Sequence, residues 1–324
     1  MDGPTIRPGR DEDEAAYIRL IGEAWAEYPG CVFDVDAELP ELRALATHVA
    51  AQGGAVWVAE EAGRVLGMVC VVPGHGGAWE IRRMYVDAAA RGSGLAQRLL
   101  ATAEAHAAAA GAVLVELWTD TRFLRAHRFY AKCSYVRSGP IRVLQDLSHS
   151  IEYRYAKPLG PAEVWRLDAQ AAASAEPRLA AILSACAAPP LAPAAAADAC
   201  REAASRVAEG RAALFAGWNG GVLAGSALLS LDAPAGRPHR AVIAGLTVLP
   251  AFRRRGLGRA LLAAAEAAAR EAGRRILLVE VAEGEAALAL CRAAGWTEAG
   301  RIPDDAPRPD GPPRPTVILY RSLA

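Results

Sequence analysis

The chain has 324 residues, of which 53% are hydrophobic and 22% charged, and its 36 basic and 36 acidic residues give no formal net charge. This length is typical of about two domains, and the apolar content suffices for folded cores, which excludes a wholly disordered chain. The balanced charge argues against nucleic-acid and membrane-surface binders, because these carry an excess of basic residues.

The N-terminal segment, MDGPTIRPGRDEDE, is polar and acidic and lacks the apolar core of a signal peptide. No stretch of about 20 apolar residues is free of charges and turn formers, so no membrane span is expected. The six cysteines form no C-x-x-C pair and have no histidine at metal-ligand spacing. This pattern favours free thiols in a reducing compartment. We therefore expect a cytoplasmic protein without a metal.

Hydrophobic periodicity and turn residues predict alternating helices and strands in the N-terminal half. Asp11 is expected to cap the first helix, and the Gly-containing turn between the first two strands predicts a hairpin. The expected helices are 12–27, 39–51, 95–110 and 121–132, and the expected strands are 56–59, 65–72, 80–86, 113–118, a strand around Val136, and 151–155.

The C-terminal half repeats the same order of elements. The expected helices are 176–187, 197–209, 257–272 and 284–294, and the expected strands are 212–216, 222–230, 240–248, 276–281 and 316–322. The proline-rich segment 187–197 is expected to be a loop, because prolines break helices. Each half is therefore predicted to be a mixed sheet with helices on its faces, an α/β or α+β layout.

An internal repeat supports this division. Residues 91–111, RGSGLAQRLLATAEAHAAAAG, match residues 253–273, RRRGLGRALLAAAEAAAREAG, at 12 of 21 positions with an offset of 162 residues. Five matches are alanine pairs, which an alanine-rich chain produces easily, but the other seven are Arg, Gly, Leu and Glu in register. Similarity at an offset of half the chain predicts two related domains. The KPLGP segment at 157–161 separates them, giving domains 1–158 and 161–324.

Each half contains an R-x-x-G-x-G/A segment between a strand and a long helix. The first segment is Arg91, Gly92, Ser93, Gly94, Leu95 and Ala96, and the second is Arg253, Arg254, Arg255, Gly256, Leu257 and Gly258. Free amides and the dipole at a helix N-terminus attract anions, and glycines let a phosphate approach the backbone. A dinucleotide-binding turn is a weaker alternative, because Gln97 stands where its third glycine would be.

The chain resembles the GNAT acetyltransferases in residues 80–100 (EIRRMYVDAAARGSGLAQRLL) and 126–139 (AHRFYAKCSYVRSG). Residues 243–262 (IAGLTVLPAFRRRGLGRALL) and 287–300 (ALALCRAAGWTEAG) carry the same resemblance in the second half. It implies two tandem GNAT folds, each with a partly splayed sheet in which acetyl-CoA inserts like a strand.

The resemblance also implies which residues bind acetyl-CoA. Met84, Tyr85 and Val86 would hold the pantetheine arm and the thioester, and Leu246, Thr247 and Val248 match them in the second half. The two glycine-containing segments would bind the pyrophosphate.

The resemblance implies Tyr130 as the proton donor to the leaving thiolate, and Cys291 stands at the matching position in the second half, where a packing role is expected. Related enzymes draw a base from the strand that carries Glu80, which is our candidate, and Val242 replaces it in the second half. Thr119, Asp120 and Arg122 are candidates for reading the acceptor.

These residues predict a catalytic N-terminal copy that transfers acetyl from acetyl-CoA to a small-molecule amine. Because Arg253–Arg255 carries more positive charge than residues 91–93, a catalytic C-terminal copy with a structural N-terminal one stays open. A protein or peptide N-acetyltransferase and a non-catalytic acyl-CoA-binding module stay open as well, and so does a homodimer.

Overall fold

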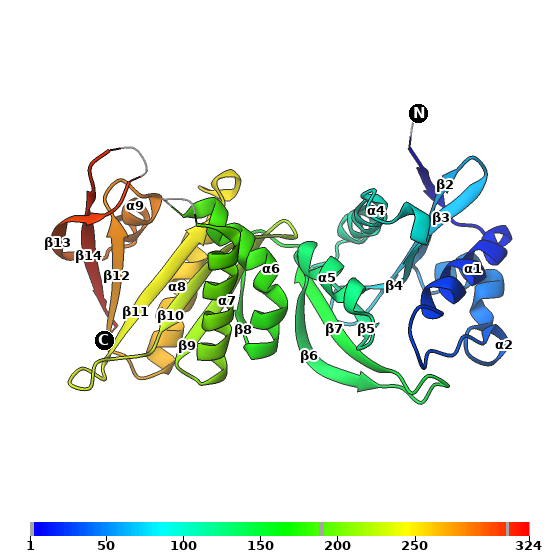
Figure 1. Cartoon of the computed structure of the whole chain (residues 1–324), viewed down its shortest axis with the longest axis horizontal. Helices are drawn as coiled ribbons and strands as arrows, with labels where there is room; N and C mark the ends of the chain where they lie inside the picture. Colours follow the sequence, from blue (N-terminus) through cyan, green and yellow to red (C-terminus); the bar gives the residue numbers. More distant parts are fainter. Residues whose placement is uncertain (1–2, 188–190, 309–310, 324) are drawn as a thin grey trace. The chain divides into compact units, whose positions relative to one another are not determined.

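The computed structural model describes residues 3–187, 191–308 and 311–323 of the chain (Figure 1). They form two compact units that divide between Leu159 and Gly160, with residues 134–136 grouped with the C-terminal unit. Within the described residues, each unit contains a mixed seven-stranded sheet with helices on its faces. The predicted α/β layout is therefore confirmed.

The N-terminal sheet has the strand order β1-β2-β3-β4-β5-β7-β6. Its strands are β1 (Thr5–Pro8), β2 (Ala55–Glu61), β3 (Arg64–Pro73), β4 (Ala78–Val86), β5 (Leu114–Asp120), β6 (Val136–Val143) and β7 (Ile151–Pro158). Its α-helices are α1 (Glu14–Trp25), α2 (Val35–Glu38), α3 (Leu45–Ala51), α4 (Leu95–Ala109) and α5 (Leu124–Lys132), and its 3₁₀ helices are Asp11–Asp13, Pro40–Ala44 and Ala88–Ala90.

Helices cover both faces of this sheet. Helices α1 and α3 pack in one core cluster with Val56 and Val58 of β2 and Met68 of β3. Helix α4 lies on the other face, where His106 contacts the rings of Trp57 and Trp79. Because side chains alternate across a strand, neighbouring residues of β2 serve the two cores.

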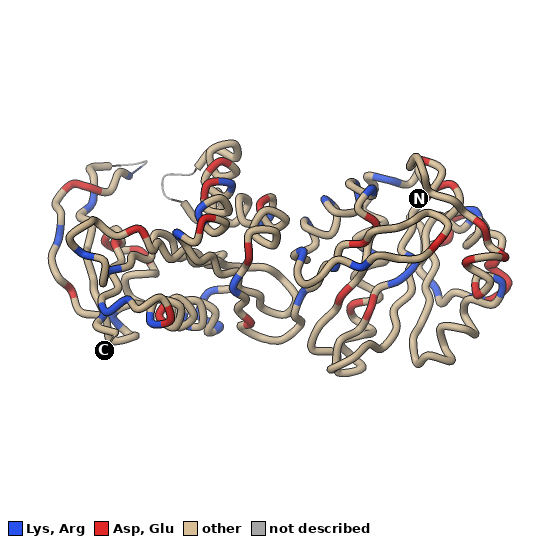
Figure 2. Tube along the Cα trace, turned by 90° about the horizontal axis from the view of Figure 1, so that it is seen from below, with Lys and Arg blue, Asp and Glu red and all other residues tan. Residues whose placement is uncertain are grey.

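The C-terminal sheet has the order β13-β14-β12-β11-β10-β9-β8. Its strands are β8 (Glu163–Leu167), β9 (Ala212–Asn219), β10 (Val222–Ser230), β11 (Arg240–Val248), β12 (Ile276–Ala282), β13 (Thr297–Ala306) and β14 (Arg314–Ser322). Its helices are α6 (Ala169–Cys186), α7 (Pro193–Ala208), α8 (Leu257–Glu271), α9 (Ala286–Ala293) and the 3₁₀ helix Pro250–Phe252. Acidic and basic residues are interspersed along the chain in both units (Figure 2).

The first hairpin of each unit is confirmed. Ala62 and Gly63 join β2 to β3 with φ values of +50° and +76°, and Gly220 and Gly221 join β9 to β10 with +57° and +76°. Two central residues with positive φ match the right-handed twist of the flanking strands, so this turn closes the hairpin without splaying it.

Each sheet is splayed at its centre, as the resemblance implies. Strand β4 pairs in parallel with β5 over Ala78–Ile81 and then continues along β3 to Val86, beyond its pairing with β5. Its register against β3 shifts at Arg83, which has a φ of +49°. The bulge turns the strand end away from β5. In the C-terminal unit β11 pairs with β12 over Arg240–Ile243 and then runs on to Val248.

Several local predictions are corrected. Asp11 does not cap the first helix, because its carboxylate accepts hydrogen bonds from the N–H (3.1 Å) and hydroxyl (2.6 Å) of Thr47. The predicted helix 39–51 is split into a 3₁₀ and an α segment after Ala44. Pro193 begins α7 instead of lying in a loop, since the first position of a helix tolerates a missing N–H. Residues 188–190 of that predicted loop lie outside the described residues.

Candidate active site

The predicted phosphate segment and the end of β4 line one cavity of about 550 Å³, which we call the loop cavity. Most of the residues that the sequence analysis assigned to acetyl-CoA in this unit contribute to it: Met84, Tyr85, Val86, Arg91, Gly92, Gly94, Leu95 and Ala96. The splayed sheet opens beside it, and helices α4 and α5 form its rim.

Glycine conformations create an open helix entrance at this cavity. Gly94 is the N-cap of α4 with a φ of +84°, and Gly92 has a φ of +79°. A Cβ atom at either position would meet nothing within 4 Å. The N–H of Arg98 donates to the Gly94 carbonyl at 3.2 Å, so the amides that precede it lie in the unpaired first turn. Such an entrance fits a diphosphate.

Ser93 shapes this loop and is absent from the set of cavity-lining residues. Its hydroxyl donates to the Ala90 carbonyl at 2.7 Å and lies 3.4 Å from the N–H of Leu95. The side chain of Leu95 is buried in the core. Ser93 and Leu95 can therefore contribute to the predicted pyrophosphate binding through their backbone groups alone.

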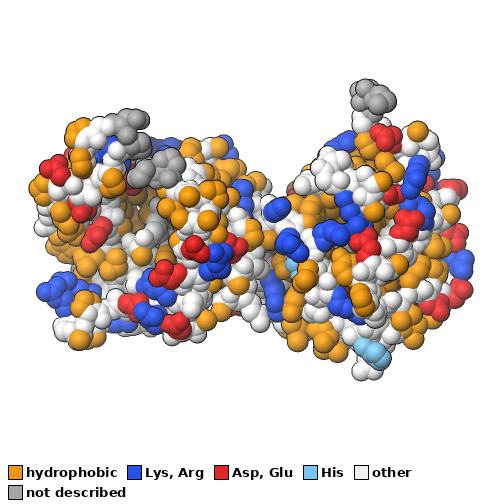
Figure 3. Space-filling view, in the orientation of Figure 1, with side chains coloured by type: hydrophobic (Ala, Val, Ile, Leu, Met, Phe, Trp, Pro, Cys, Tyr) orange, Lys and Arg blue, Asp and Glu red, His pale blue; other side chains and the backbone are white. Residues whose placement is uncertain are grey.

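Basic side chains of α5 add positive charge that the sequence analysis did not anticipate. Arg125, Arg128 and Lys132 line the loop cavity together with Arg91. Arg91 and Arg125 pair with Glu27 at 2.5 and 2.8 Å. Lys and Arg side chains gather over α4 and α5 in the space-filling view (Figure 3). The spacing of Arg125, Arg128 and Lys132 along one short helix was the sequence signal that could have predicted this positive charge.

Asp87 anchors the loop to the end of β4. It is 6% exposed, and its carboxylate accepts from Arg19 (3.0 Å), Arg64 (2.7 Å) and the N–H of Ala89 (3.0 Å). The Ala89 amide and the two guanidinium groups lower the pKa of Asp87 below its usual value. Leu249 stands at the matching position of the C-terminal unit.

We expect Asp87→Asn to destabilise the protein by about 1–3 kcal/mol at neutral pH, because charge-assisted hydrogen bonds are lost in a buried place. A lowered folded pKa stabilises the fold above the unfolded value, about 3.9, and this contribution disappears as pH falls through the folded pKa. Denaturant titrations should therefore show different free energies of unfolding for the two proteins at neutral pH and similar ones at acidic pH. The control is Glu23→Gln, which removes an exposed partner of Arg19 and should cost below about 1 kcal/mol. An equal loss of stability in Asp87→Asn and Glu23→Gln would contradict the anchoring role of Asp87.

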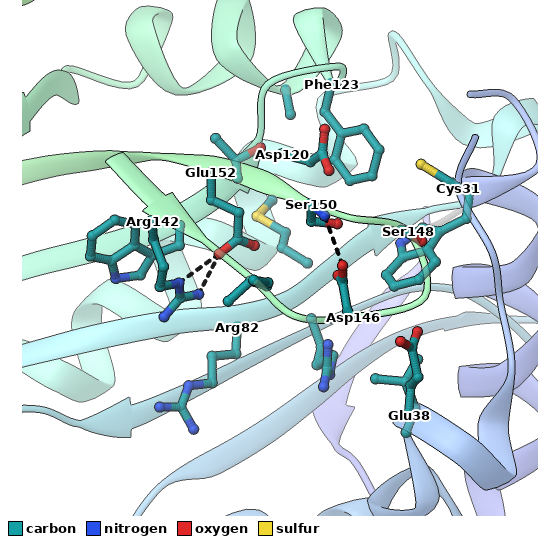
Figure 4. Close-up of a pocket in the computed structure, with 18 of the residues that line it drawn as sticks. Cys31, Glu38, Arg82, Asp120, Phe123, Arg142, Asp146, Ser148, Ser150 and Glu152 are labelled. Carbon is teal, nitrogen blue, oxygen red and sulfur yellow. Dashed lines mark hydrogen bonds and ion pairs between the residues drawn. The ribbon is translucent and has the colours of Figure 1, made fainter. Parts of the chain in front are cut away.

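A second cavity, of about 650 Å³, lies against the hairpin of β6 and β7, and we call it the hairpin cavity (Figure 4). The charged residues that line it are Glu38, Glu80, Asp120, Asp146, Glu152, Arg82, Arg83 and Arg142. Five carboxylates against three guanidinium groups make the lining acidic overall. A cationic ligand is therefore favoured.

The two cavities meet at one place. They share Trp25, Met84, Tyr85, Phe123, Ala126 and Tyr130 as lining residues. The Trp25 indole N–H donates to the Tyr85 hydroxyl at 2.9 Å, and burial raises the pKa of that tyrosine. A group held in one cavity can thus reach a group held in the other beside the splayed end of β4.

Tyr130 lies at this meeting point on α5, the helix that follows β5. It is 7% exposed, and its ring centroid lies 5.3 Å from that of Phe129 and 6.3 Å from that of Tyr155. Burial raises the pKa of its hydroxyl, which therefore stays protonated at neutral pH, as a proton donor must. His127 packs on Tyr155 and interacts with the Asp120 carbonyl.

The candidate base, Glu80, lines the hairpin cavity and pairs with Arg82 at 2.7 Å. Three residues separate it from Met84 along β4. Glu80 therefore lines the hairpin cavity but is not one of the residues that the two cavities share.

Two of the three acceptor candidates line the hairpin cavity, and the third pairs with one of them. Thr119 and Asp120 line it, and Arg122 donates to Asp120 through Nε (2.8 Å) and Nη2 (2.6 Å). Arg122 also reaches the Ser148 carbonyl at 3.3 Å, and the Ser148 hydroxyl accepts from the Val32 N–H at 2.8 Å. These bonds fasten the β6–β7 hairpin over the cavity.

Both strands of the β6–β7 hairpin were predicted, but the contribution of the hairpin to this cavity was not. Arg142, Asp146, Ser148, Ser150 and Glu152 reach the cavity through the pairing of β7 with β5, in which Glu152 lies opposite Asp120. The alternation in Ile151–Tyr155 indicated a strand, but it could not show which cavity that strand faces.

The C-terminal unit keeps the geometry of the loop. Gly256 is the N-cap of α8 with a φ of +88°, and Arg254 has a φ of +63°. Arg253 donates from Nε to the Val248 carbonyl at 3.0 Å, which brings the segment next to Leu246–Val248. The guanidinium of Arg255 lies 5.5 Å above the Phe252 ring.

Three of the residues that were predicted to bind a CoA-type ligand in this unit contact other parts of the unit or are buried in its core. Thr247 shares a 2.9 Å hydrogen bond with Ser226, Leu257 is buried, and a Cβ on Gly258 would lie 3.0 Å from Leu290.

Cys291 is fully buried in the core of the C-terminal unit, and burial raises the pKa of its thiol to about 11. It packs with residues of α8, β12 and β14. The expected packing role of this cysteine is confirmed, and its neutral thiol lies within the core.

The described residues contain no cluster of three or more His, Cys, Asp or Glu side chains that could hold a metal ion. No helix among them is long and apolar enough to span a bilayer.

Comparison with solved structures finds similar folds over half of the chain. An Escherichia coli ribosomal-protein-S18-alanine N-acetyltransferase is 24% identical, with 50% of this chain and 94% of that chain covered and a TM-score of 0.41. A Staphylococcus aureus GNAT-family acetyltransferase is 17% identical over 48% of this chain and 99% of that chain, with a TM-score of 0.43. A Salmonella typhimurium protein whose structure contains acetyl-CoA is 19% identical, with 50% of this chain and 94% of that chain covered and a TM-score of 0.41.

The family model described as "Acetyltransferase (GNAT) family" matches residues 18–135 and again residues 178–296. The two matches cover most of the chain, one in each structural unit, and they agree with the internal repeat and the two splayed sheets. The chain therefore belongs to the GNAT acetyltransferase family and carries two copies of its fold in tandem.

Proposed function

We propose that the N-terminal unit transfers an acetyl group from acetyl-CoA to the amino group of a small cationic molecule. The observation that carries the proposal is the meeting of the two cavities at six shared residues, which include Tyr130. Acetyl-CoA would occupy the loop cavity, and the amine would occupy the hairpin cavity. Free thiols at all six cysteines agree with the cytoplasmic setting that we propose.

The residues of the loop cavity have separate tasks in binding. The amides after Gly94 and the positive end of α4 receive the pyrophosphate, and Arg125, Arg128 and Lys132 supply charge for phosphate groups. The unpaired end of β4 offers backbone groups to an extended pantetheine arm. The thioester brought there supplies the activated acetyl group.

The residues at the meeting point act on the transfer itself. Tyr130 holds a proton for the leaving sulfur, and the aromatic side chains of Trp25 and Phe123 exclude water from the junction. In the hairpin cavity the acidic lining attracts a protonated amine. A carboxylate there must take one proton before the nitrogen can attack.

The elements that border the hairpin cavity favour a small acceptor over a polypeptide. The β6–β7 loop is tied to the segment after α1 through Ser148 and Val32, and the Leu147 N–H donates to Glu38 of α2. A peptide chain would need an open groove across these elements. A small amine needs only the cavity.

The test is a screen of amines and peptides with the full chain and acetyl-CoA, read out as release of the CoA thiol. We expect release with small cationic amines and little with peptides. Release that survives EDTA would agree with the proposed metal-free chemistry. Preference for peptide N-termini would point to the protein acetyltransferase alternative, and binding without release for any acceptor would point to the non-catalytic module.

A further inference from the structure

Glu152 occupies a distinctive place among the carboxylates of the hairpin cavity. It lies on β7 opposite Asp120 of β5, and its side chain is 16% exposed. Its carboxylate pairs with Arg142 of β6 at 2.5 Å (Figure 4). The Arg142 guanidinium lies 4.5 Å above the ring of Trp118, which fixes its position beside the carboxylate.

The other carboxylates of this cavity accept hydrogen bonds from the hairpin or pair with arginine side chains. Although burial alone would raise the pKa of Asp120, hydrogen bonds from Arg122 lower it. Asp146 accepts the N–H of Ser150 at 2.7 Å and shapes the hairpin loop. Glu38 accepts the N–H of Leu147, and Glu80 pairs with Arg82.

In the sheet register Glu152 is level with Met84, one of the residues that the two cavities share. Its partner Asp120 lies three residues beyond Leu117 on β5, and Met84 lies three residues beyond Ile81, the partner of Leu117, on β4. Tyr85 is one of the shared residues, and burial raises its pKa with a further contribution in the same direction from the negative charge of Glu152. A charge that acts on the Tyr85 hydroxyl lies within electrostatic reach of a nitrogen held at the junction.

We propose, on the basis of the proposed function, that Glu152 is the general base that deprotonates the acceptor amine, with Arg142 as its positioning residue. Glu152 takes one proton from the ammonium group. The neutral nitrogen forms a C–N bond at the acetyl carbonyl carbon while the C–S bond breaks, and the sulfur leaves with the proton of Tyr130. The second nitrogen proton returns to Tyr130 through water, and Glu152 releases its proton to solvent.

The groups around Glu152 tune its basicity. Burial raises the pKa of Glu152, Arg142 opposes that change, and the charges of Asp120 and Asp146 act in the same direction as burial. A raised pKa brings a carboxylate closer to neutrality, where a general base works best. Arg82 lines the same cavity but is paired with Glu80.

The test compares Glu152→Gln with Glu116→Gln in steady-state kinetics over a range of pH. Glu116 is a matched control, because it pairs with Arg154 at 2.5 Å, is 19% exposed on the neighbouring strand and lies outside both sets of lining residues. We expect Glu152→Gln to lower kcat/KM by about 10²–10⁴-fold at neutral pH. Glu116→Gln should stay within about threefold of wild type.

The pH profile separates a base from a residue that only supports the fold. The activity of Glu152→Gln should rise with pH toward that of wild type, because the amine then loses its proton without help. Arg142→Gln removes a positive neighbour and so raises the pKa of Glu152, which should move the acidic limb of the profile to higher pH.

Three results would overturn the inference. Full activity in Glu152→Gln would do so while leaving the proposed function intact. A loss of the acidic limb in Glu80→Gln instead would identify the base predicted from the sequence. Wild-type protein without acetyl transfer to any amine would refute the proposed function, and the inference with it. Melting curves of each variant show whether a loss of activity comes from unfolding.

Discussion

Replacing Tyr130 by Phe is expected to lower kcat by about 10²–10⁴-fold while binding of acetyl-CoA hardly changes. A general acid contributes about this much in rate, which corresponds to roughly 3–5 kcal/mol of barrier. The variant keeps the ring, which is buried against Phe129 and Tyr155, and loses only the hydroxyl. The loss should therefore fall on kcat rather than on stability or affinity.

Cys291→Ala is the matched control, because Cys291 stands at the position of Tyr130 in the second copy and is buried in its core. We expect its kcat within about threefold of wild type. Steady-state kinetics with a saturating amine, together with melting curves, make the comparison. A Tyr130→Phe enzyme within threefold of wild type would mean that water or another residue supplies the proton.

Gly94→Glu is expected to abolish binding of acetyl-CoA and turnover, because it sets a negative charge against the phosphates at the entrance of α4. The mirror variant, Gly256→Glu, should cost much less activity. Both glycines have nearly the same φ, +84° and +88°, so each variant carries a similar backbone penalty of about 1–2 kcal/mol. A difference in activity between the two variants therefore reflects the role of each site in binding acetyl-CoA and not the backbone strain.

Calorimetric titration with acetyl-CoA and the thiol-release assay measure the two effects separately. Gly94→Ala is the control for strain without charge, and it should keep part of the binding. If Gly256→Glu alone abolished activity, the working site would lie in the C-terminal copy and the roles of the two units would be reversed.

The elements that depend on local sequence could be predicted. The R-x-x-G-x-G/A segments predicted both helix entrances, because positive φ at Gly94 and Gly256 is a local property of glycine. The alternating apolar runs predicted both first hairpins and the long helices α4 and α8. Tyr130 was implied by the resemblance of RFYAKCSY to the GNAT pattern, and it lies at the junction of the two cavities.

Features that depend on long-range pairing could not be predicted. Arg83 adopts a left-handed conformation because the bulge in β4 and its 2.5 Å ion pair with Glu41 hold it there, and nothing local in its sequence demands this. Glu152 reaches the hairpin cavity only through the register of β7 on β5. The short strands β1 and β8 carry weak periodicity, and pairing with β2 and β9 stabilises them.

The central claim is acetyl transfer to a small amine, and an isotope-labelled acetyl group tests it most directly. The full chain is incubated with labelled acetyl-CoA and the amine that releases most thiol, and the products are separated by mass spectrometry. We expect the label to appear on the nitrogen of the amine, in amounts equal to the thiol released, and Tyr130→Phe to slow its appearance. Label recovered only as free acetate, or retained in acetyl-CoA beside unchanged amine, would contradict this claim.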